Sequence, residues 1–295
     1  MHTNTLARGR SARQAFTLIE LLVVISIIGL LTGLIVAGTM KFKDVSRVNA
    51  ADAQVTKYQQ ALEAEYNFVV QKCHKEGPPD LVITYCGGNV ERAKAVHTAA
   101  SLRINFPETF AEAEAAASFS INGYQYNVKN TFASVRGIAS ATPASTTSIP
   151  TANEQKAILL YLIVKEKATA GTGNDTDASG EYRTVTFGTK SLTLIIDSFG
   201  SPLVYNRWAR GGELENPPYV AQSSATTKDP LDPRGLVSAW SGLSSLNTIA
   251  DLGFNNQNRL PTVVSSGRNK IFENFGGDDR VGYRLSRFGA KGDQK

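Results

Sequence analysis

The chain has 295 residues, of which 42% are hydrophobic and 19% charged, so it is long enough for one large domain or two small ones. Its formal net charge of +5 would suggest nucleic acid as a partner, but three arginines, Arg8, Arg10 and Arg13, lie in a short N-terminal leader. Without them the chain has 28 basic and 26 acidic residues, and no Lys/Arg-rich block with interleaved aromatic residues remains. The composition therefore gives no support to nucleic-acid binding.

An apolar segment runs from Phe16 to about Ala37 and is long enough to cross a bilayer as a helix. Glu20 lies inside this segment, where a carboxylate is costly unless it has a partner or stays near the interface. A cleaved secretory signal would have a shorter apolar region that ends in a small-x-small site, and an ordinary anchor has no use for Glu20. The leader arginines predict a cytoplasmic N-terminus.

The sequence Phe16-Thr17-Leu18-Ile19-Glu20, behind a basic leader, resembles the class III signal of type IV pilins and type II secretion pseudopilins. The resemblance implies that residues 1–15 are a leader peptide, that a peptidase cuts after Ala15 and that Phe16 is then N-methylated. It also implies that Glu20 acts in subunit assembly. Ala15 stands where the family usually has Gly, and it is the nearest substitute in size.

The helix is expected to continue beyond the membrane, with a transmembrane and assembly part over 16–38 and an amphipathic part over 39–76. Apolar residues in the second part recur at steps of three, four and seven, which marks one face of a helix: Val45, Val48, Val55, Tyr58, Leu62, Tyr66 and Val69. No Gly or Pro interrupts this part, and Gly77-Pro78-Pro79 is expected to end it. Such a face has to be buried against a globular domain.

The chain has two cysteines, Cys73 and Cys86, and the predicted topology puts both outside the cytoplasmic membrane, where disulfides persist. They could form a bridge or remain two unpaired thiols, because a sequence does not fix the distance between their Cα atoms.

Residues 77–150 are predicted to be a large insertion of unclear structure. Short helices are expected at Val90–Leu102 and Pro107–Ala117, and one or two strands within Ser118–Ile138. Ala139–Thr151 is rich in Ser, Thr, Ala and Pro and indicates a loop.

Residues 151–295 are expected to contain a helix, a β-sheet and long loops. The helix is predicted to start at an Asn153 cap and to bury Ile158, Leu159, Leu162 and Ile163. Strands are predicted at Tyr182–Phe187, Leu192–Ile196, Leu203–Tyr205 and Thr262–Ser266. The first two are expected to form a hairpin, and the strands from Tyr182 to Tyr205 are expected to form one antiparallel sheet with the last strand near it. The whole is an α+β chain with a pilin-like fold, in which a long N-terminal helix packs on an antiparallel sheet.

Two C-terminal motifs narrow the resemblance toward the major pseudopilins. The segment from Asp197 to Tyr205 resembles their Asp-Pro-Trp-Gly-Asn-Pro-x-x-Tyr hairpin, and the matching residues are Asp197, Gly200, Pro202 and Tyr205. The tail around Gly276–Tyr283 is similar to the stretch that holds calcium in that family. This resemblance implies oxygen ligands from Asp278, Asp279 and Asn269, while the alternative is a turn with two solvated acids.

We find no nucleophile motif, phosphate loop or zinc-protease motif, and the chain has only three histidines, so we expect no enzyme and no required cofactor beyond the candidate calcium. The main hypothesis is a structural subunit of a type II secretion pseudopilus. The alternatives are a type IV pilus subunit and a membrane-anchored binding or enzymatic domain. The expected partners are further copies of the chain, other pilin-like subunits, prepilin peptidase and an inner-membrane assembly platform. The expected location is the bacterial inner membrane, crossed once, with a periplasmic C-terminal domain and a filament after assembly.

Overall fold

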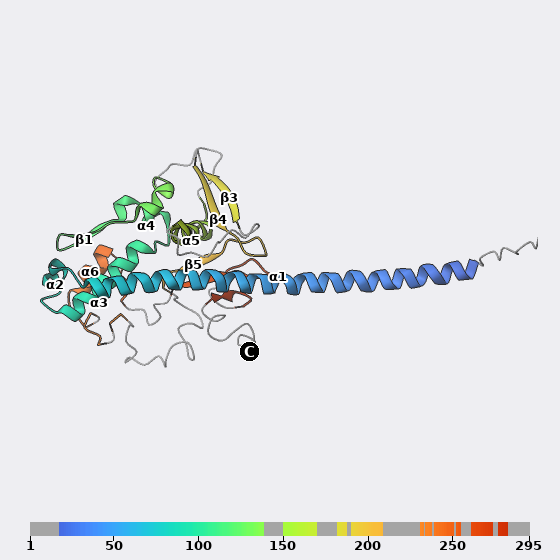
Figure 1. Ribbon diagram of the computed structural model, residues 1–295, viewed down its shortest axis with the longest axis horizontal. Coiled ribbons are helices and arrows are strands. Elements are labelled where there is room, and N and C mark those ends of the chain that lie inside the picture. The colour runs from blue at the N-terminus through green and yellow to red at the C-terminus, as the bar shows by residue number, and fades with distance from the viewer. Residues whose placement is uncertain are drawn as a thin grey trace, which may run out of the picture. The chain divides into compact units, whose positions relative to one another are not determined.

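The longest element is α1, a helix of 59 residues from Leu18 to Glu76 (Figure 1). In the computed structural model, the described residues are 18–138, 150–169, 182–187, 190–208, 231–232, 234–237, 239–250, 252–254, 261–273 and 277–282. The chain divides into two compact units, Met1–Ser46 and Arg47–Lys295, and α1 contributes residues to both. The arrangement is α+β, a long N-terminal helix followed by small antiparallel sheets, and it is consistent with the pilin-like fold.

The C-terminal end of α1 is set by Gly77. Its backbone has a φ of +72°, and its N–H donates to the Cys73 carbonyl at 3.0 Å, as expected of a glycine just past a helix end. Pro78 and Pro79 follow and cannot continue the helix. The end predicted from the sequence is confirmed.

Within the second unit, α1 buries one face from Ala51 to Cys73. Val55, Tyr58 and Leu62 are at most 1% exposed, which confirms the face predicted from their spacing. The prediction is wrong for Val45, which is 54% exposed, because burial of this face begins only at Ala51.

The main hydrophobic core combines this face of α1 with α5, β4, β5 and β6. The bounds are Ala152–Thr169 for α5, Lys190–Ile195 for β4, Val204–Asn206 for β5 and Thr262–Ser265 for β6. The cap of α5 differs from the prediction: the side chain of Thr151, not Asn153, accepts a hydrogen bond from the Glu154 N–H at 3.3 Å. Glu154 Oε2 accepts from the Thr151 N–H in return at 3.0 Å, which makes a capping box.

The strands form three small antiparallel sheets in the described part of the chain. The first pairs β1 (Phe119–Ile121) with β2 (Tyr124–Tyr126), the second pairs β3 (Tyr182–Phe187) with β4, and the third has the order β5-β6-β7, with β7 at Arg280–Val281. The predicted hairpin of β3 and β4 is confirmed, with Tyr182 opposite Ile195. The predicted single sheet from Tyr182 to Tyr205 is wrong, since β5 pairs with β6 and meets the end of β4 only through an isolated bridge between Ile196 and Pro202.

The region 77–150 is described up to residue 138 and again at residue 150. Its helices are α2 (Asp80–Tyr85), α3 (Val90–Asn105) and α4 (Phe110–Ala113), with the 3-10 turns η1 (Ala115–Ala117) and η2 (Asn130–Val135). The expected helix at 90–102 is confirmed. The helix expected over Pro107–Ala117 is instead two short pieces, because Glu114 has an extended backbone between them. The loop expected at 139–151 lies mostly outside the described residues.

A second hydrophobic cluster is built on α2, α3 and the β1–β2 hairpin. Later residues complete it, among them Leu246 of α6 (Leu243–Ala250) and Phe254. The hairpin turns at Asn122 and Gly123, which both have positive φ, as a two-residue turn of this type requires. The region expected to be an insertion thus shares its core with a segment more than 100 residues later in the chain.

Candidate functional site

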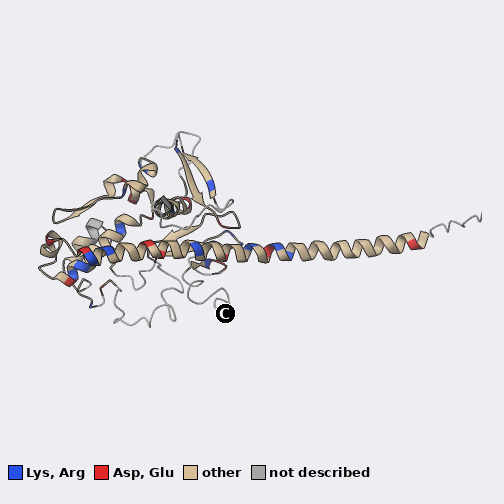
Figure 2. Ribbon diagram, viewed as in Figure 1, with Lys and Arg blue, Asp and Glu red and all other residues tan. Residues whose placement is uncertain are grey.

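The N-terminal part of α1 exposes apolar side chains on all sides. Every residue from Leu18 to Ser46 is exposed, and the chain has no Lys, Arg, Asp or Glu between Glu20 and Lys41 (Figure 2). By length and composition this is a helix that could cross a membrane, and it lies near the N-terminus. A helix that is apolar all round needs lipid or other helices to cover it.

Hydroxyl groups in this part of α1 make hydrogen bonds to backbone carbonyls of the same helix. The hydroxyl of Ser26 donates to the Leu22 carbonyl at 2.8 Å, and that of Thr32 donates to the Ile28 carbonyl at 2.7 Å. A hydroxyl that bonds a carbonyl one turn earlier carries no unmet hydrogen bond into hydrocarbon. The segment is therefore compatible with a bilayer except at one position, Glu20.

Glu20 lies in the first turn of α1 and its side chain is exposed. A carboxylate is favoured at this end of a helix by the partial positive charge of the free N–H groups. In hydrocarbon it would still be costly without a cation close by. Ala15 and Phe16, the predicted cleavage and methylation residues, lie outside the described residues, so the structure does not place them against Glu20.

Three glycines leave positions without a side chain along this part of α1. A Cβ atom added at Gly29, Gly33 or Gly38 would meet nothing within 4 Å. The described residues therefore do not use the close approach that glycine permits, and such positions suit the contact of one helix with another.

The turn predicted from Asp197 to Pro202 is built around the Asp197 carboxylate. Its Oδ1 accepts hydrogen bonds from the N–H groups of Phe199 at 2.9 Å and Ser201 at 2.8 Å. Its Oδ2 accepts one from the hydroxyl of Ser265 on β6 at 2.6 Å. Gly200 has a φ of +83°, a conformation that favours glycine. Asp197 is 3% exposed, and burial raises the pKa of its carboxyl despite these hydrogen bonds. The motif thus fixes the exit of β4 onto the neighbouring sheet.

Tyr205, the last residue of this motif, lies on β5 and is fully buried. Its hydroxyl donates a hydrogen bond to the carbonyl of Pro107, and burial raises its pKa well above the usual value for tyrosine. The residue therefore links β5 to the segment between α3 and α4.

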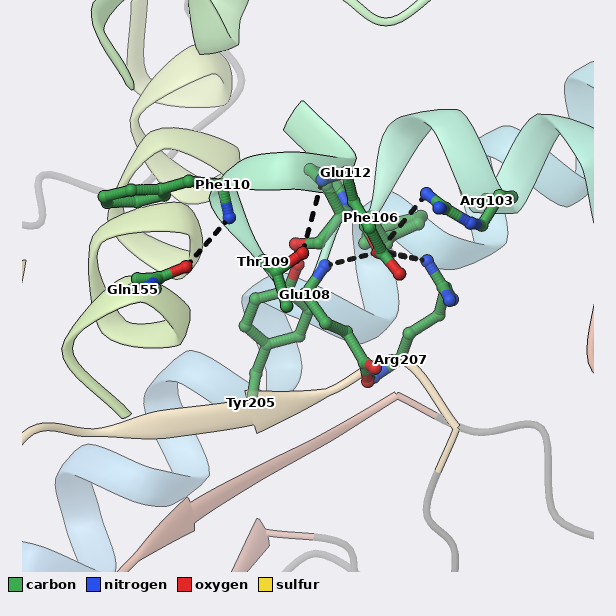
Figure 3. A network of polar contacts seen from close by, with 10 residues as sticks. Arg103, Phe106, Glu108, Thr109, Phe110, Glu112, Gln155, Tyr205 and Arg207 are labelled. Atoms are coloured by element: carbon green, nitrogen blue, oxygen red, sulfur yellow. Dashed lines mark hydrogen bonds and ion pairs between the residues drawn. The ribbon is translucent and has the colours of Figure 1, made fainter. Parts of the chain in front are cut away.

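An ion-pair network strengthens the same link (Figure 3). Glu112 Oε2 lies 3.2 Å from Arg103 Nη1 and 3.0 Å from Arg207 Nη1, and it accepts the Glu108 N–H at 2.9 Å. Arg207 is 3% exposed and its Nη1 also donates to the Phe106 carbonyl at 3.0 Å. Two guanidinium groups thus share one partly buried carboxylate, which links the end of β5 to α3 and α4.

The candidate calcium residues are brought into one loop, but its own hydrogen bonds occupy several of their oxygens. Asn269 Oδ1 accepts the Ile271 N–H at 2.8 Å, Asp278 Oδ2 accepts the Asn269 N–H at 3.0 Å, and Asp279 Oδ2 accepts the Glu273 N–H at 2.9 Å. Asp278 Oδ1 is buried without a hydrogen-bond partner in the described part of the chain, as a cation ligand would be. No group of three His, Cys, Asp or Glu side chains able to hold a metal is found among the described residues. Calcium at this loop stays a prediction.

The two cysteines are free thiols, so the structure has the second of the two alternatives. Cys73 belongs to the main core and Cys86 to the second cluster, and both are buried. Burial raises the pKa of the Cys73 thiol and raises that of Cys86 to about 11. Both thiols are therefore protonated and poorly reactive at neutral pH.

One residue that organises α1 was missed in the sequence. Gln59 is fully buried, its Nε2 donates to the Pro261 carbonyl at 2.9 Å, and its Oε1 accepts the Val263 N–H at 2.8 Å. It therefore joins α1 to the start of β6. Gly282 is required beside it, since an added Cβ would lie 2.5 Å from Gln59 Oε1. The only sequence feature that could have identified Gln59 is its position next to Tyr58 on the apolar face.

Comparison with known proteins agrees with the geometry of the N-terminal helix. Residues 10–36 match the family model of the prokaryotic N-terminal methylation motif, which includes Ala15, Phe16 and Glu20. No curated protein and no solved structure matches the chain. The match covers the N-terminal segment alone. The motif is characteristic of the type IV pilin and pseudopilin family, and together with the apolar helix that it begins it supports a type IV pilin-like protein processed by prepilin peptidase.

Proposed function

We propose that the protein is a structural subunit of a type II secretion pseudopilus. In this proposal prepilin peptidase cuts between Ala15 and Phe16, Phe16 is methylated, and the subunits polymerise through the N-terminal part of α1. The observation that carries the proposal is the run from Leu18 to Met40, which is apolar, exposed on every side and overlaps the methylation motif. A surface of this kind is stable only in a bilayer or against other helices.

Glu20 supplies the order in such an assembly. Cleavage creates a new amine at Phe16, four residues before the carboxylate. Pairing with the Phe16 amine of a neighbouring subunit would neutralise both charges in an apolar setting, where an ion pair is strongly favoured over two separate ions. Because the pair forms only at one axial offset between two helices, it would fix the register of the filament.

The turn from Asp197 to Tyr205 favours a pseudopilus over a pilus. Asp197 and Gly200 form the turn, Pro202 makes the bridge to Ile196, and Tyr205 is buried against Pro107. Each matching residue of the pseudopilin-like hairpin thus has a structural use in this chain, as the resemblance to that motif implies.

A type IV pilus subunit is the second candidate, and one observation favours it. The second hydrophobic cluster forms a separate packed region of α2, α3 and the β1–β2 hairpin. Neither the methylation motif nor the Asp197–Tyr205 turn explains this region. Extra surface of this kind suits a subunit that is displayed outside the cell. The two candidate functions imply the same partners: further copies of the chain, other pilin-like subunits, the peptidase and an inner-membrane assembly platform.

Mass spectrometry of the mature N-terminus, combined with fractionation of sheared filaments, tests the proposal. We expect a chain that starts at methylated Phe16 and that stays with the cell envelope at its native level of expression. A mature chain starting near Gly38 would contradict the pilin-type processing. Abundant filaments in the sheared fraction would favour the type IV pilus.

A further inference from the structure

A cavity of about 260 Å³ lies between the C-terminal part of α1, α3 and β2, all within the second unit. Its deeper part is formed by buried residues, Cys73, His97, Ser101 and Tyr126, and its outer part by more exposed ones such as Phe68 and Lys72. It is separate from the apolar part of α1 that the assembly proposal uses, and the inference below does not depend on that proposal.

His97 lines the cavity and is held through one of its two ring nitrogens. Its Nδ1 lies 2.9 Å from the hydroxyl oxygen of Tyr126, and its ring packs against the rings of Tyr126 and Tyr124, with centroids 5.7 and 6.1 Å away. The side chain is 6% exposed, and no described residue makes a hydrogen bond with Nε2. Burial lowers the pKa of His97, so the ring is neutral at neutral pH and Nε2 offers a single donor or acceptor.

Two further polar groups follow on the same face of α3. Ser101 and Asn105 come four and eight residues after His97, and this spacing places all three along one side of the helix. Asn105 Nδ2 donates to the Ser101 carbonyl at 2.6 Å, which leaves its Oδ1 as an acceptor toward the cavity. The face therefore presents a short row of uncharged hydrogen-bonding groups, of which the Ser101 hydroxyl also bonds the Cys73 thiol.

The charges around the cavity nearly cancel. Lys72 lies 3.9 Å from Glu76, both on α1, and Lys129, just before η2, lies 3.5 Å from Glu65 of α1. A site for phosphate or another strong anion would have uncompensated cations. The balance favours an uncharged ligand with several hydroxyl groups.

An aromatic surface lies beside these polar groups. Phe68 is 56% exposed at the cavity although it is apolar, and Tyr124 is half-buried there. Aromatic faces combined with a few well-placed polar groups are typical of small-molecule sites. The volume is just below the roughly 300 Å³ at which pockets for drug-sized ligands begin, so it suits one small ring.

We propose that this cavity binds a single pyranose ring of a saccharide, either a free monosaccharide or the terminal sugar of a glycan. One face of a pyranose carries mainly C–H groups and would lie on Phe68, while its hydroxyl groups would bond His97 Nε2, Ser101 and Asn105 Oδ1. A neutral polyhydroxylated ring matches the charge balance, the size and the pairing of an aromatic surface with uncharged polar groups.

The test uses the full chain in a zwitterionic detergent without a sugar headgroup. The probes are the methyl glycosides of glucose, galactose and N-acetylglucosamine, and binding is followed by saturation transfer from protein to sugar in NMR. We expect at least one of them to bind with an affinity in about the millimolar range. Soluble oligosaccharides that end in the same sugar form a second arm, and their affinity relative to the methyl glycoside distinguishes a terminal sugar from a free one.

Three variants make the test specific. His97→Asn places an amide at the position of Nδ1, so it can retain the Tyr126 contact while Nε2 is lost, and it should weaken binding about tenfold, as should Phe68→Ala. Lys94→Met, at an exposed position of α3 that does not line the cavity, is the control and should bind as the wild type. The proposal is overturned if none of the sugars binds, if His97→Asn and Phe68→Ala bind as well as the control, or if inorganic phosphate competes for the site.

Discussion

The two parts of α1 differ more than any other two regions of the molecule, although they belong to one helix. Leu30 is 65% exposed, whereas Leu62 is fully buried, and the same contrast holds for valines in the two parts. Helix formation is the same in both, so the difference comes from what covers the side chains. The chain supplies cover from Ala51 onward, and before Ser46 it supplies none from its described residues.

The difference teaches that a single element can serve two purposes, and that mutations should separate them. A change in the buried part should alter the free energy of unfolding of the second unit. A change in the exposed part should leave that free energy unaltered and should act on membrane insertion or assembly, where its contacts form.

The largest expected effect concerns Glu20 and the yield of filaments. Glu20→Ala should leave the protein cleaved and inserted but should nearly abolish its incorporation, because the neighbouring Phe16 amine would then have no carboxylate to pair with in an apolar setting. Glu20→Asp retains the charge on a shorter side chain and should give an intermediate yield. Pulse-chase processing and quantification of sheared or cross-linked filaments measure the two steps separately.

The outcome of that experiment also separates two roles for Glu20. A block of cleavage in Glu20→Ala would assign the residue to recognition by the peptidase. Normal filaments from a normally processed Ala variant would contradict the pairing with Phe16.

Two leucine variants test the comparison directly. Leu62→Ala should destabilise the second unit by about 2–5 kcal/mol, since it removes buried methyl groups and leaves a cavity. Leu30→Ala makes the same chemical change at an exposed position of the same helix and should leave the unfolding midpoint unchanged. Denaturant unfolding of the full chain in micelles, followed by tryptophan fluorescence, gives both values, and equal effects would show that the two parts do not differ as described.

The sequence pattern predicted α1 well because its information is local. The spacing of Val55, Tyr58 and Leu62 has one explanation, a helix with a buried side, and the match to the methylation motif needs only consecutive residues. The start of α5 was predicted two residues late, since Asn153 and Thr151 are both good caps and only the Glu154 that follows Thr151 by three residues selects the latter.

The predictions that failed concern features that depend on residues far apart in the sequence. Alternation identifies a strand but not its partner, so nothing in Val204–Asn206 indicated that it pairs with β6 instead of extending the sheet of β4. The second hydrophobic cluster joins α3 to Leu246 and Phe254 across more than 100 residues, and its alanines have no pattern that names such partners. The Asp197 turn was predicted as a motif, whereas its bond to Ser265 could be seen only in the fold.

A smaller effect on the free energy of unfolding is expected at the Asp197 turn, which belongs to the second unit. Asp197→Ala removes the acceptor for two turn N–H groups and for the Ser265 hydroxyl, and should cost about 2–3 kcal/mol of stability. Asp197→Asn keeps Oδ1 for the two N–H groups, and its amide can donate to the Ser265 oxygen, so most of the stability should return. A loss as large in Asn as in Ala, measured by denaturant unfolding, would show that the charge and not the hydrogen bonds holds the turn.

The smallest expected effect is a pH dependence that belongs to the second unit alone. Burial lowers the pKa of His97 below its ordinary value of 6.5, while Glu76 opposes this shift less strongly. Between the two values the unfolded chain binds more protons than the folded one, so the free energy of unfolding should fall as the pH falls below about 6.5. The loss should continue down to the lowered pKa and then stop growing. Denaturant titrations between pH 8 and about 5 measure it while most carboxylates stay ionised.

His97→Asn is the control, since it removes the titrating ring and can keep a hydrogen bond to Tyr126. The decline attributable to His97 should be absent in this variant, and the remaining slope then reports the other titrating groups. The buried Asp197 carboxyl does not mimic the effect, because its raised pKa makes the folded state bind the proton first, so its contribution to stability increases as the pH falls. A decline in the Asn variant equal to that of the wild type would mean that the charge state of His97 does not matter to the fold, and that the cavity beside it tolerates a protonated ring.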